Sequence, residues 1–194
     1  MSSFGSLSPV QAFAASAFNT GSLLVQGKLK LPQANVGASL RFRDGTTSRV
    51  YRETVLAGDP CPEPALLVVR FRLKLIGVNP SLHALFQAES ILNTPLFAGF
   101  PGFRSKLWCT DEETGVYRGI YQWDGPVRAG EYAGTLLELL KLVSVDGSLS
   151  YHVQPETLRD TFLASASPQV EERGEASGAW WRLREGAEPW SMSS

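Results

Sequence analysis

The stretch GFPGFRSKLWCTDEETGVYRGIYQWDG, residues 99–125, has two aromatic segments on either side of an acidic turn. FRSKLWCT and VYRGIYQW each have the alternation and the aromatic content of a strand, and DEETG between them is rich in turn formers. We therefore predict an antiparallel strand pair. One strand carries Lys106 and Trp108, and its partner carries Arg118 and Gln122, so the pair also raises the possibility of a polar and aromatic site.

The segments on either side of this pair extend the pattern. ALLVVRFRLKLIG, residues 65–77, alternates apolar with basic residues and predicts a strand. NPSLHALFQAESIL, residues 79–92, and the apolar stripe within residues 126–143 predict two helices. SYHVQP, residues 150–155, predicts a last short strand. The resulting order of elements is βαββαβ, which is the ferredoxin-like order of an α+β protein.

The N-terminal third has a different pattern. Residues 1–20 are either a loose arm or a short helix over residues 10–18, and the alternation in residues 22–31 predicts a strand. The Asp44-Gly45 pair between two alternating runs predicts a β-hairpin. We expect three regions: an N-terminal arm and β-hairpin extension over residues 1–62, a ferredoxin-like domain over residues 63–163, and a polar C-terminal tail over residues 164–194. The candidates for docking this tail onto the core are Trp180, Trp181 and Trp190.

The bulk composition is that of an ordinary globular protein, with 43% hydrophobic and 19% charged residues and a formal net charge of -1. No basic excess points to nucleic acid. Cys61 and Cys109 have no second ligand at metal-binding spacing, so we expect two free thiols and no metal. There is no basic N-terminal region and no membrane-length apolar run, and we expect a cytoplasmic protein without a membrane partner. Motifs for dinucleotides, nucleotides, serine hydrolysis and zinc peptidases are absent from the sequence.

The phrases GFPGFRSKLW, GIYQWDG and SYHVQP, in βαββαβ order, resemble the dimeric α/β-barrel superfamily and, within it, the YdhR-like monooxygenase group. The resemblance covers about residues 65–163. It implies a homodimer in which two sheets pair into a barrel and enclose a cavity. It also implies a small-molecule enzyme of secondary metabolism that uses no cofactor, either a monooxygenase or a cyclase or isomerase. The implied substrate is a hydrophobic, aromatic or polyketide-like anion.

The resemblance implies that the sheet face opposite the helices lines this cavity. Alternation along the predicted strands places several basic, polar and aromatic side chains on that face, with the register between strands assumed. The predicted catalytic residues are His152, Arg72 and Arg118. The predicted substrate-binding residues are Arg70, Lys74, Lys106, Trp108, Ile120, Gln122, Ser150, Phe100 and Phe103.

Each of these predictions has a plainer alternative. His152 is either a general base or a hydrogen-bonded structural histidine. The arginines and lysines either stabilise an enolate or form a solvated, salt-bridged face. Among the aromatics, Tyr121 and Trp123 are expected in the core, whereas Trp108 is expected in the pocket. The segment NTPLFAGFPGF, residues 93–103, is either a cavity lid or a rigid turn. For the protein as a whole, the alternative to an enzyme is a non-catalytic ligand-binding or assembly protein.

Overall fold

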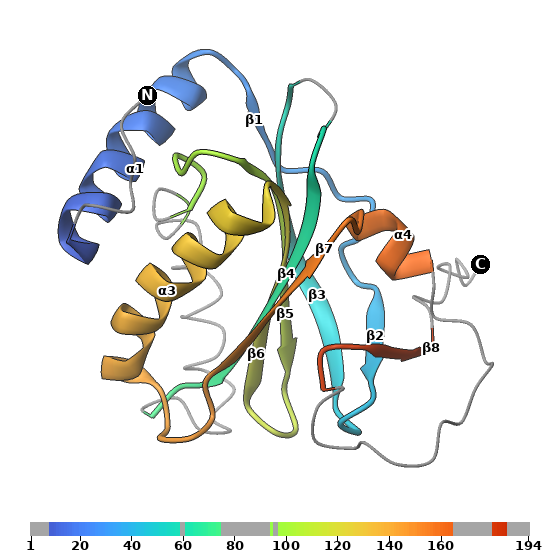
Figure 1. Ribbon diagram of the computed structural model, residues 1–194. Coiled ribbons are helices and arrows are strands. Elements are labelled where there is room, and N and C mark those ends of the chain that lie inside the picture. Colours follow the sequence, from blue (N-terminus) through green and yellow to red (C-terminus); the bar gives the residue numbers. More distant parts are fainter. Residues whose placement is uncertain (1–7, 59–60, 75–93, 95–96, 165–179, 186–194) are drawn as a thin grey trace.

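A computed structural model describes residues 8–58, 61–74, 94, 97–164 and 180–185. The helix predicted over residues 79–92 and the docking of Trp190 lie outside the described residues. The described elements form an α+β protein in which one curled antiparallel sheet separates two layers of other elements (Figure 1).

Four strands form one side of the sheet, with β7 at its edge: β4 (Pro64–Arg72), β5 (Phe103–Asp111), β6 (Val116–Asp124) and β7 (Ser150–Pro155). Their order across the sheet is β7-β4-β6-β5, with every neighbouring pair antiparallel. Numbered along the chain from β4, this is the order 4-1-3-2, which two split βαβ units produce. The predicted strand pair of residues 99–125 is therefore confirmed as β5 and β6.

The N-terminal segment lengthens this sheet beyond β5. β3 (Thr47–Leu56) pairs with β5 on one side and with β2 (Ser39–Phe42) on the other. β2 in turn pairs with the short C-terminal strand β8 (Leu183–Glu185), and β1 (Leu29–Lys30) pairs with the end of β3. The strand predicted over residues 22–31 is wrong for its first part, because residues 22–25 are helical.

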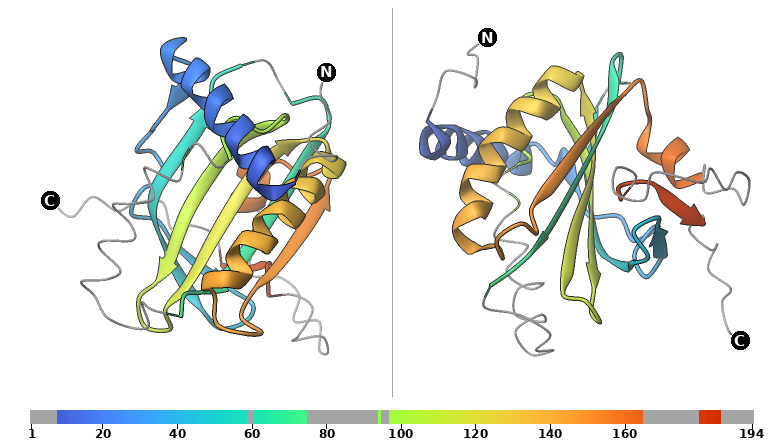
Figure 2. Two further views of the ribbon diagram at one scale, coloured as in Figure 1. Left: turned by 90° about the vertical axis from the view of Figure 1, so that its left-hand side faces the viewer. Right: turned by 60° about the horizontal axis from the view of Figure 1, so that its bottom comes forward.

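Two long helices, α1 (Pro9–Val25) and α3 (Pro126–Val143), lie on the same face of the sheet (Figure 2). α1 begins with a capping box: the Ser8 hydroxyl accepts a hydrogen bond from the Gln11 amide, and the Gln11 side chain accepts one from the Ser8 amide. The helix is longer than the predicted segment 10–18, because apolar and small residues continue to Val25. α3 matches the helix predicted from the apolar stripe.

Each sheet face has its own hydrophobic core. On the helix side, Phe97, Phe103, Trp108, Tyr121 and Trp123 pack with residues of α1 and α3. On the other side, a second buried cluster is formed with contributions from β2, α4 (Arg159–Ala164) and Trp181. This second face is therefore covered by the same chain (Figure 1).

Gly119 in β6 is needed for the packing of the helix-side core. A Cβ atom at this position would lie 2.5 Å from a ring carbon of Tyr121 and 2.8 Å from its hydroxyl oxygen. The Tyr121 ring therefore covers the Gly119 backbone. Only the absence of a side chain lets this ring fold back over its own strand.

Candidate functional site

The strand register divides the predicted site residues between the two sheet faces. In the β5–β6 pair, Lys106 is opposite Tyr121, whereas Cys109 is opposite Arg118. Residues that are directly opposite lie on the same face. Lys106 and Trp108 therefore belong to the helix side, and Arg118 and Ile120 belong to the other side. Our assignment of all of them to one cavity face is wrong, because it assumed a register one residue away from the true one.

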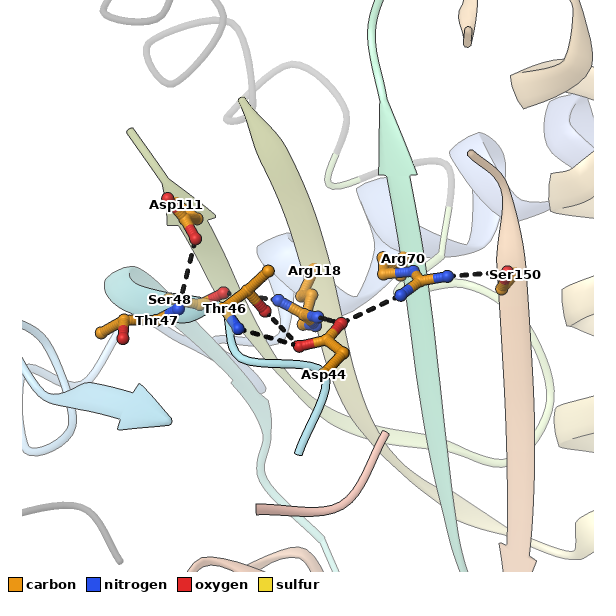
Figure 3. Close-up of polar contacts among 8 residues, drawn as sticks. All are labelled: Asp44, Thr46, Thr47, Ser48, Arg70, Asp111, Arg118 and Ser150. Carbon is orange, nitrogen blue, oxygen red and sulfur yellow. Dashed lines mark hydrogen bonds and ion pairs between the residues drawn. The ribbon is translucent and has the colours of Figure 1, made fainter. Parts of the chain in front are cut away.

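On the face away from the helices, the β2–β3 turn inserts Asp44 between two arginines (Figure 3). Asp44 Oδ2 lies 2.9 Å from Nη1 of Arg70 and also accepts a short hydrogen bond from Nη2 of Arg118. Arg118 also donates to Ser48 Oγ at 3.0 Å, and its side chain is fully buried. Arg70 also makes a long hydrogen bond of 3.5 Å to Ser150 Oγ.

The charges of this cluster hold one another in their ionised forms. Burial favours the neutral acid of Asp44, but hydrogen bonds from Thr46 and the charge of Arg118 outweigh it and lower the pKa. Burial lowers the pKa of Arg118 to about 10, against the opposing effect of Asp44. Both groups therefore stay charged near neutral pH. The anion that these arginines were predicted to bind is, in this structure, the carboxylate of Asp44.

His152, the predicted general base, is stacked against the C-terminal segment. Its ring lies 4.0 Å from the Trp181 ring, with an angle of 8° between the planes. Nε2 is 3.3 Å from Oε1 of Gln154. The neighbouring Trp180 lies under the guanidinium of Arg70, at 4.7 Å. Docking of the tail through Trp180 and Trp181 is confirmed, and these indoles cover His152 and Arg70.

The other predicted residues of this face are dispersed. Gln122 makes hydrogen bonds to the backbone: its Nε2 donates to the carbonyl of Ala65, and its Oε1 accepts from the amide of Arg159. Arg72 is exposed, and Lys74 forms an exposed ion pair of 3.3 Å with Asp146. Ile120 is wholly buried within the second core. Arg72 and Lys74 thus lie at the exposed C-terminal end of β4, and neither belongs to the Asp44 cluster.

On the helix side, Lys106 is buried among aromatic rings. Its Nζ lies 3.1 Å from the ring centroid of Trp108, 4.6 Å from that of Phe97 and 4.8 Å from that of Tyr121. The side chain is 6% exposed. Within the described part of the chain, no carboxylate forms an ion pair with it. Burial, and secondarily the nearby charge of Arg52, lower the pKa of Lys106 well below its ordinary value.

Arg52 is a residue of this site that the sequence analysis missed. It lies opposite Trp108 in the β3–β5 pair, and its guanidinium is 5.3 Å from the centre of the indole ring. Its Nη2 donates to Thr94 Oγ1 at 2.6 Å. The alternation of β3 carried the signal, but the pairing of β3 with β5 is not evident from the sequence. The Nε1 of Trp108 donates a 3.3 Å hydrogen bond to Thr54 Oγ1.

Beside this aromatic cluster lies a cavity of about 450 Å³ between α1 and residues 98–104. Two of the predicted substrate-binding residues, Phe100 and Phe103, line it together with Leu23 and Leu56. The volume is within the range of small-molecule sites, roughly 300–1,000 Å³. Phe103 connects the cavity to the cluster, because its ring packs 5.0 Å from that of Phe97.

The wall formed by residues 98–104 is a rigid turn held against α1. A Cβ at Gly99 would lie 2.0 Å from the carbonyl oxygen of Ser16, so the two backbones touch there. Asn19 donates a 3.0 Å hydrogen bond to the Gly99 carbonyl. Gly102 has φ of 89°, a conformation that favours glycine. For the described residues 97–103 of this segment, these contacts favour the rigid turn.

Charged groups lie at one end of the cavity. Arg104 Nη2 is 3.2 Å from Oδ2 of Asp124, and both residues line the cavity. Burial opposes ionisation of Asp124, but a hydrogen bond from the Glu63 amide and the proximity of Arg104 lower its pKa. Cys61 donates to the Trp123 carbonyl at 3.2 Å, and burial together with Asp124 raises the pKa of this thiol. Cys61 is therefore a poor nucleophile.

Metal and membrane sites find no support in the described residues. They contain no group of three or more His, Cys, Asp and Glu side chains placed to hold a metal ion. Cys61 and Cys109 are free thiols. Across the same residues, none of the helices has the length and apolarity to cross a bilayer.

Three solved structures that are similar to this chain are so at low identity and with TM-scores below 0.5. A heme-degrading enzyme from Listeria monocytogenes is similar at 12% identity and a TM-score of 0.41, over 64% of this chain and 95% of that chain. A ferredoxin-fold protein from the same species, related to antibiotic biosynthesis monooxygenases, matches at 15% identity and a TM-score of 0.40, over 72% and 88%. An anthrone oxidase-like protein matches at 16% identity and a TM-score of 0.33, over 58% and 57%. No family model and no curated protein matches the sequence.

The chain is thus structurally similar to ferredoxin-fold, monooxygenase-like proteins. At these identities and TM-scores the likeness does not transfer an activity or a site residue. The narrower resemblance to the YdhR-like group and the homodimer stay predictions.

Proposed function

We propose that the protein is a cofactor-independent enzyme that binds a hydrophobic aromatic molecule on the helix side of the sheet and removes a proton from it. The observation that carries this proposal is the burial of the Lys106 amine, 3.1 Å from the Trp108 ring centroid and beside a cavity lined by Phe100 and Phe103. A desolvated lysine next to another cation is a known way to obtain an unprotonated amine near neutral pH.

Lys106 is the proposed general base. An amine can accept a proton only in its neutral form, and burial together with Arg52 favours that form. When the substrate gives up its proton, Lys106 becomes an ammonium ion beside the new carbanion. Arg52, whose guanidinium also lies against Trp108, adds a second positive charge for the anion.

The expected substrate is a planar aromatic compound with an acidic C–H bond beside a carbonyl group. The rings of Phe97, Trp108 and Tyr121 offer flat apolar contact. For an anthrone, proton loss from the methylene carbon gives a delocalised anion. Molecular oxygen then oxidises this carbon to a second carbonyl, with one oxygen atom entering the quinone and the other leaving as water.

Access to Lys106 requires a small rearrangement. Phe97 and Phe103 lie between the cavity and the amine, with their centroids 5.0 Å apart. Rotation of one of these rings would open a path from the cavity to the amine. If the rings do not move, the cavity holds a molecule without converting it, and this barrier is the reason to retain the alternative of a non-catalytic ligand-binding protein.

The test uses 1,8-dihydroxy-9-anthrone as the probe, with oxygen consumption and quinone absorbance as readouts. Lys106→Met keeps the length and apolar packing of the side chain but removes the base. We expect it to reduce turnover by roughly 10²- to 10⁴-fold. The matched control is Lys74→Met, which removes an exposed lysine in the turn after β4 and leaves turnover unchanged.

Two outcomes would contradict the proposal. Retained turnover in Lys106→Met would exclude this lysine as the base. Saturable binding of the probe, measured by quenching of tryptophan fluorescence, with no oxygen uptake by the wild type would instead support the non-catalytic alternative.

A further inference from the structure

Helix α1 has an exposed apolar stripe on the side that faces away from the sheet. The exposed fractions are 78% for Val10, 82% for Phe18, 55% for Leu24 and 90% for Val25. At 3.6 residues per turn these four side chains lie within about a third of the helix circumference. The small exposed residues in the same stripe are Ala14, Ala17 and Gly21.

The inner face of the same helix is already used. Ala12, Phe13, Ser16 and Thr20 are buried against the rest of the helix-side core. A helix that covers a sheet ordinarily has one apolar side and one charged side. α1 has apolar residues on both sides, and its 17 residues, PVQAFAASAFNTGSLLV, include no charged side chain.

The neighbouring helix α3 also exposes apolar residues, including Leu142 and Val143, but it differs from α1 in charge. Its outward side carries Arg128, Glu131, Glu138 and Lys141, and the last two form a 2.7 Å ion pair. The exposed Val127 of α3 is therefore flanked by charges. The uncharged outer face of α1 is a property of this helix, and it is not shared by the whole helix layer.

We propose that this outer face of α1, from Val10 to Val25, binds the same face of a second copy of the chain, with the two helices antiparallel. The absence of charge identifies the partner surface. An uncharged apolar stripe is best matched by another uncharged apolar stripe, because burying unpaired charges of a partner would be unfavourable. A membrane surface is a poorer match, since interfacial helices bring Lys and Arg to the lipid headgroups and α1 has none.

The order of residues along the stripe fits a two-fold axis between Ala17 and Phe18. About this axis, Phe18 meets the partner's Ala17, and Ala14 meets the partner's Gly21. A large residue is thus opposite a small one, and small residues on both helices allow close approach. The space beside Gly21 is open, because a Cβ atom added there would have no neighbouring atom within 4 Å. Self-complementarity of this kind is what an isologous dimer requires.

This interface differs from the barrel dimer that the sequence resemblance implied. In that dimer, partner sheets meet through the face opposite the helices, and here β2, α4 and Trp181 cover that face. Association through α1 leaves this covering in place. The proposal does not depend on the proposed activity, since neither Lys106 nor its aromatic neighbours are part of the stripe.

Sedimentation velocity of the full chain over a range of micromolar concentrations tests the interface. We expect a dimer for the wild type and at least a tenfold larger dissociation constant for Phe18→Glu. Phe18 is 82% exposed, so the substitution should not disturb the fold, and circular dichroism checks this. Val127→Glu, at a position of α3 that is 72% exposed, is the matched control and should remain dimeric.

Cysteine cross-linking tests the antiparallel arrangement, in a background with Cys61→Ser. Ala17→Cys, next to the proposed axis, should form a disulfide dimer under mild oxidation, whereas Val10→Cys alone should not. Val10→Cys combined with Val25→Cys should cross-link, because these positions meet across the axis. A monomeric wild type, a dimer that persists in Phe18→Glu, cross-linking of Val10→Cys alone, or Phe18-dependent sedimentation with neutral lipid vesicles would each overturn the proposal.

Discussion

Both faces of the sheet carry basic and aromatic side chains, but the buried cations have different surroundings on the two faces. On the face away from the helices, the cations Arg70 and Arg118 share the carboxylate of Asp44, and Trp180 lies against Arg70. On the helix side, the buried Lys106 is surrounded by aromatic rings and lies beside a cavity. Buried charges that are paired serve the fold, whereas a buried group with a strongly shifted pKa next to a cavity is a candidate for chemistry.

The largest expected effect comes from breaking the ion pairs on the sheet face away from the helices. Asp44→Asn leaves the fully buried Arg118 without its counter-charge. We expect a loss of about 3–5 kcal/mol in the free energy of unfolding, measured by urea denaturation. The matched control Asp146→Asn removes the exposed partner of Lys74 and should change stability by less than about 1 kcal/mol. Equal effects of the two substitutions would mean that the Asp44 cluster does not hold this face together.

The next effect concerns packing on the helix side. Gly119→Ala introduces a methyl group 2.5 Å from the buried Tyr121 ring, and we expect a loss of about 1–3 kcal/mol by the same measurement. Gly134→Ala in α3 meets no neighbouring atom within 4 Å and should stabilise the protein by up to about 1 kcal/mol through helix propensity. An unchanged stability in Gly119→Ala would show that Tyr121 is not fixed over β6.

The third prediction uses the pH dependence of stability. Folding lowers the pKa of Lys106, so between its folded value and the unfolded value of 10.5 the unfolded chain binds more protons. Stability from this group therefore rises with pH across that window, by up to about 1.4 kcal/mol per pH unit. Lys106→Met should lack this component.

The comparison is made between the two proteins at each pH, because Cys109 contributes in the opposite direction in both. Its pKa is raised by burial to about 12, so its stabilisation is lost as pH rises above 9.0. A difference between wild type and Lys106→Met that does not change from pH 6 to pH 9 would mean that Lys106 is protonated in the folded protein.

The smallest effects are expected for two residues that the sequence singled out as catalytic. His152→Ala removes the stacking with Trp181 and should cost about 0.5–1.5 kcal/mol. Arg72→Ala changes an exposed side chain and should be within about 0.5 kcal/mol of the wild type. Neither should reduce turnover of the anthrone probe by more than a few-fold. A loss of turnover in either variant would instead place the active site on the sheet face away from the helices.

The strands and α3 could be predicted because local patterns specify them. The Asp44-Gly45 turn, the acidic turn of residues 111–115 and the stripe of α3 each act over a few residues. Residues 22–25 were assigned to a strand as part of the alternation seen across residues 22–31, but the helix that starts at the Ser8 capping box continues through them.

Individual residues of the candidate site were named from the sequence, but their arrangement on the two sheet faces was not predicted. Lys106, Trp108, Phe100 and Phe103 were named from the sequence, and the structure places Trp108 in the helix-side core and Phe100 and Phe103 at the cavity. Their grouping with Arg118 failed because Asp111, which was predicted to belong to the turn, is the last residue of β5 and lies opposite Val116. This one-residue difference exchanges the faces of the strand, and the residue types of the turn do not show it. The contribution of Arg52 depends on the pairing of β3 with β5, which joins segments about fifty residues apart.

The most direct test of the central claim is the protonation of Lys106 in the folded protein. A heteronuclear NMR titration of lysine side chains, with Lys106→Met to assign the signal and the exposed lysines as an internal reference, measures it. We predict that Lys106 titrates well below 10.5 and apart from the exposed lysines. If Lys106 titrates together with them, its amine is protonated at neutral pH, and the helix-side face holds no base.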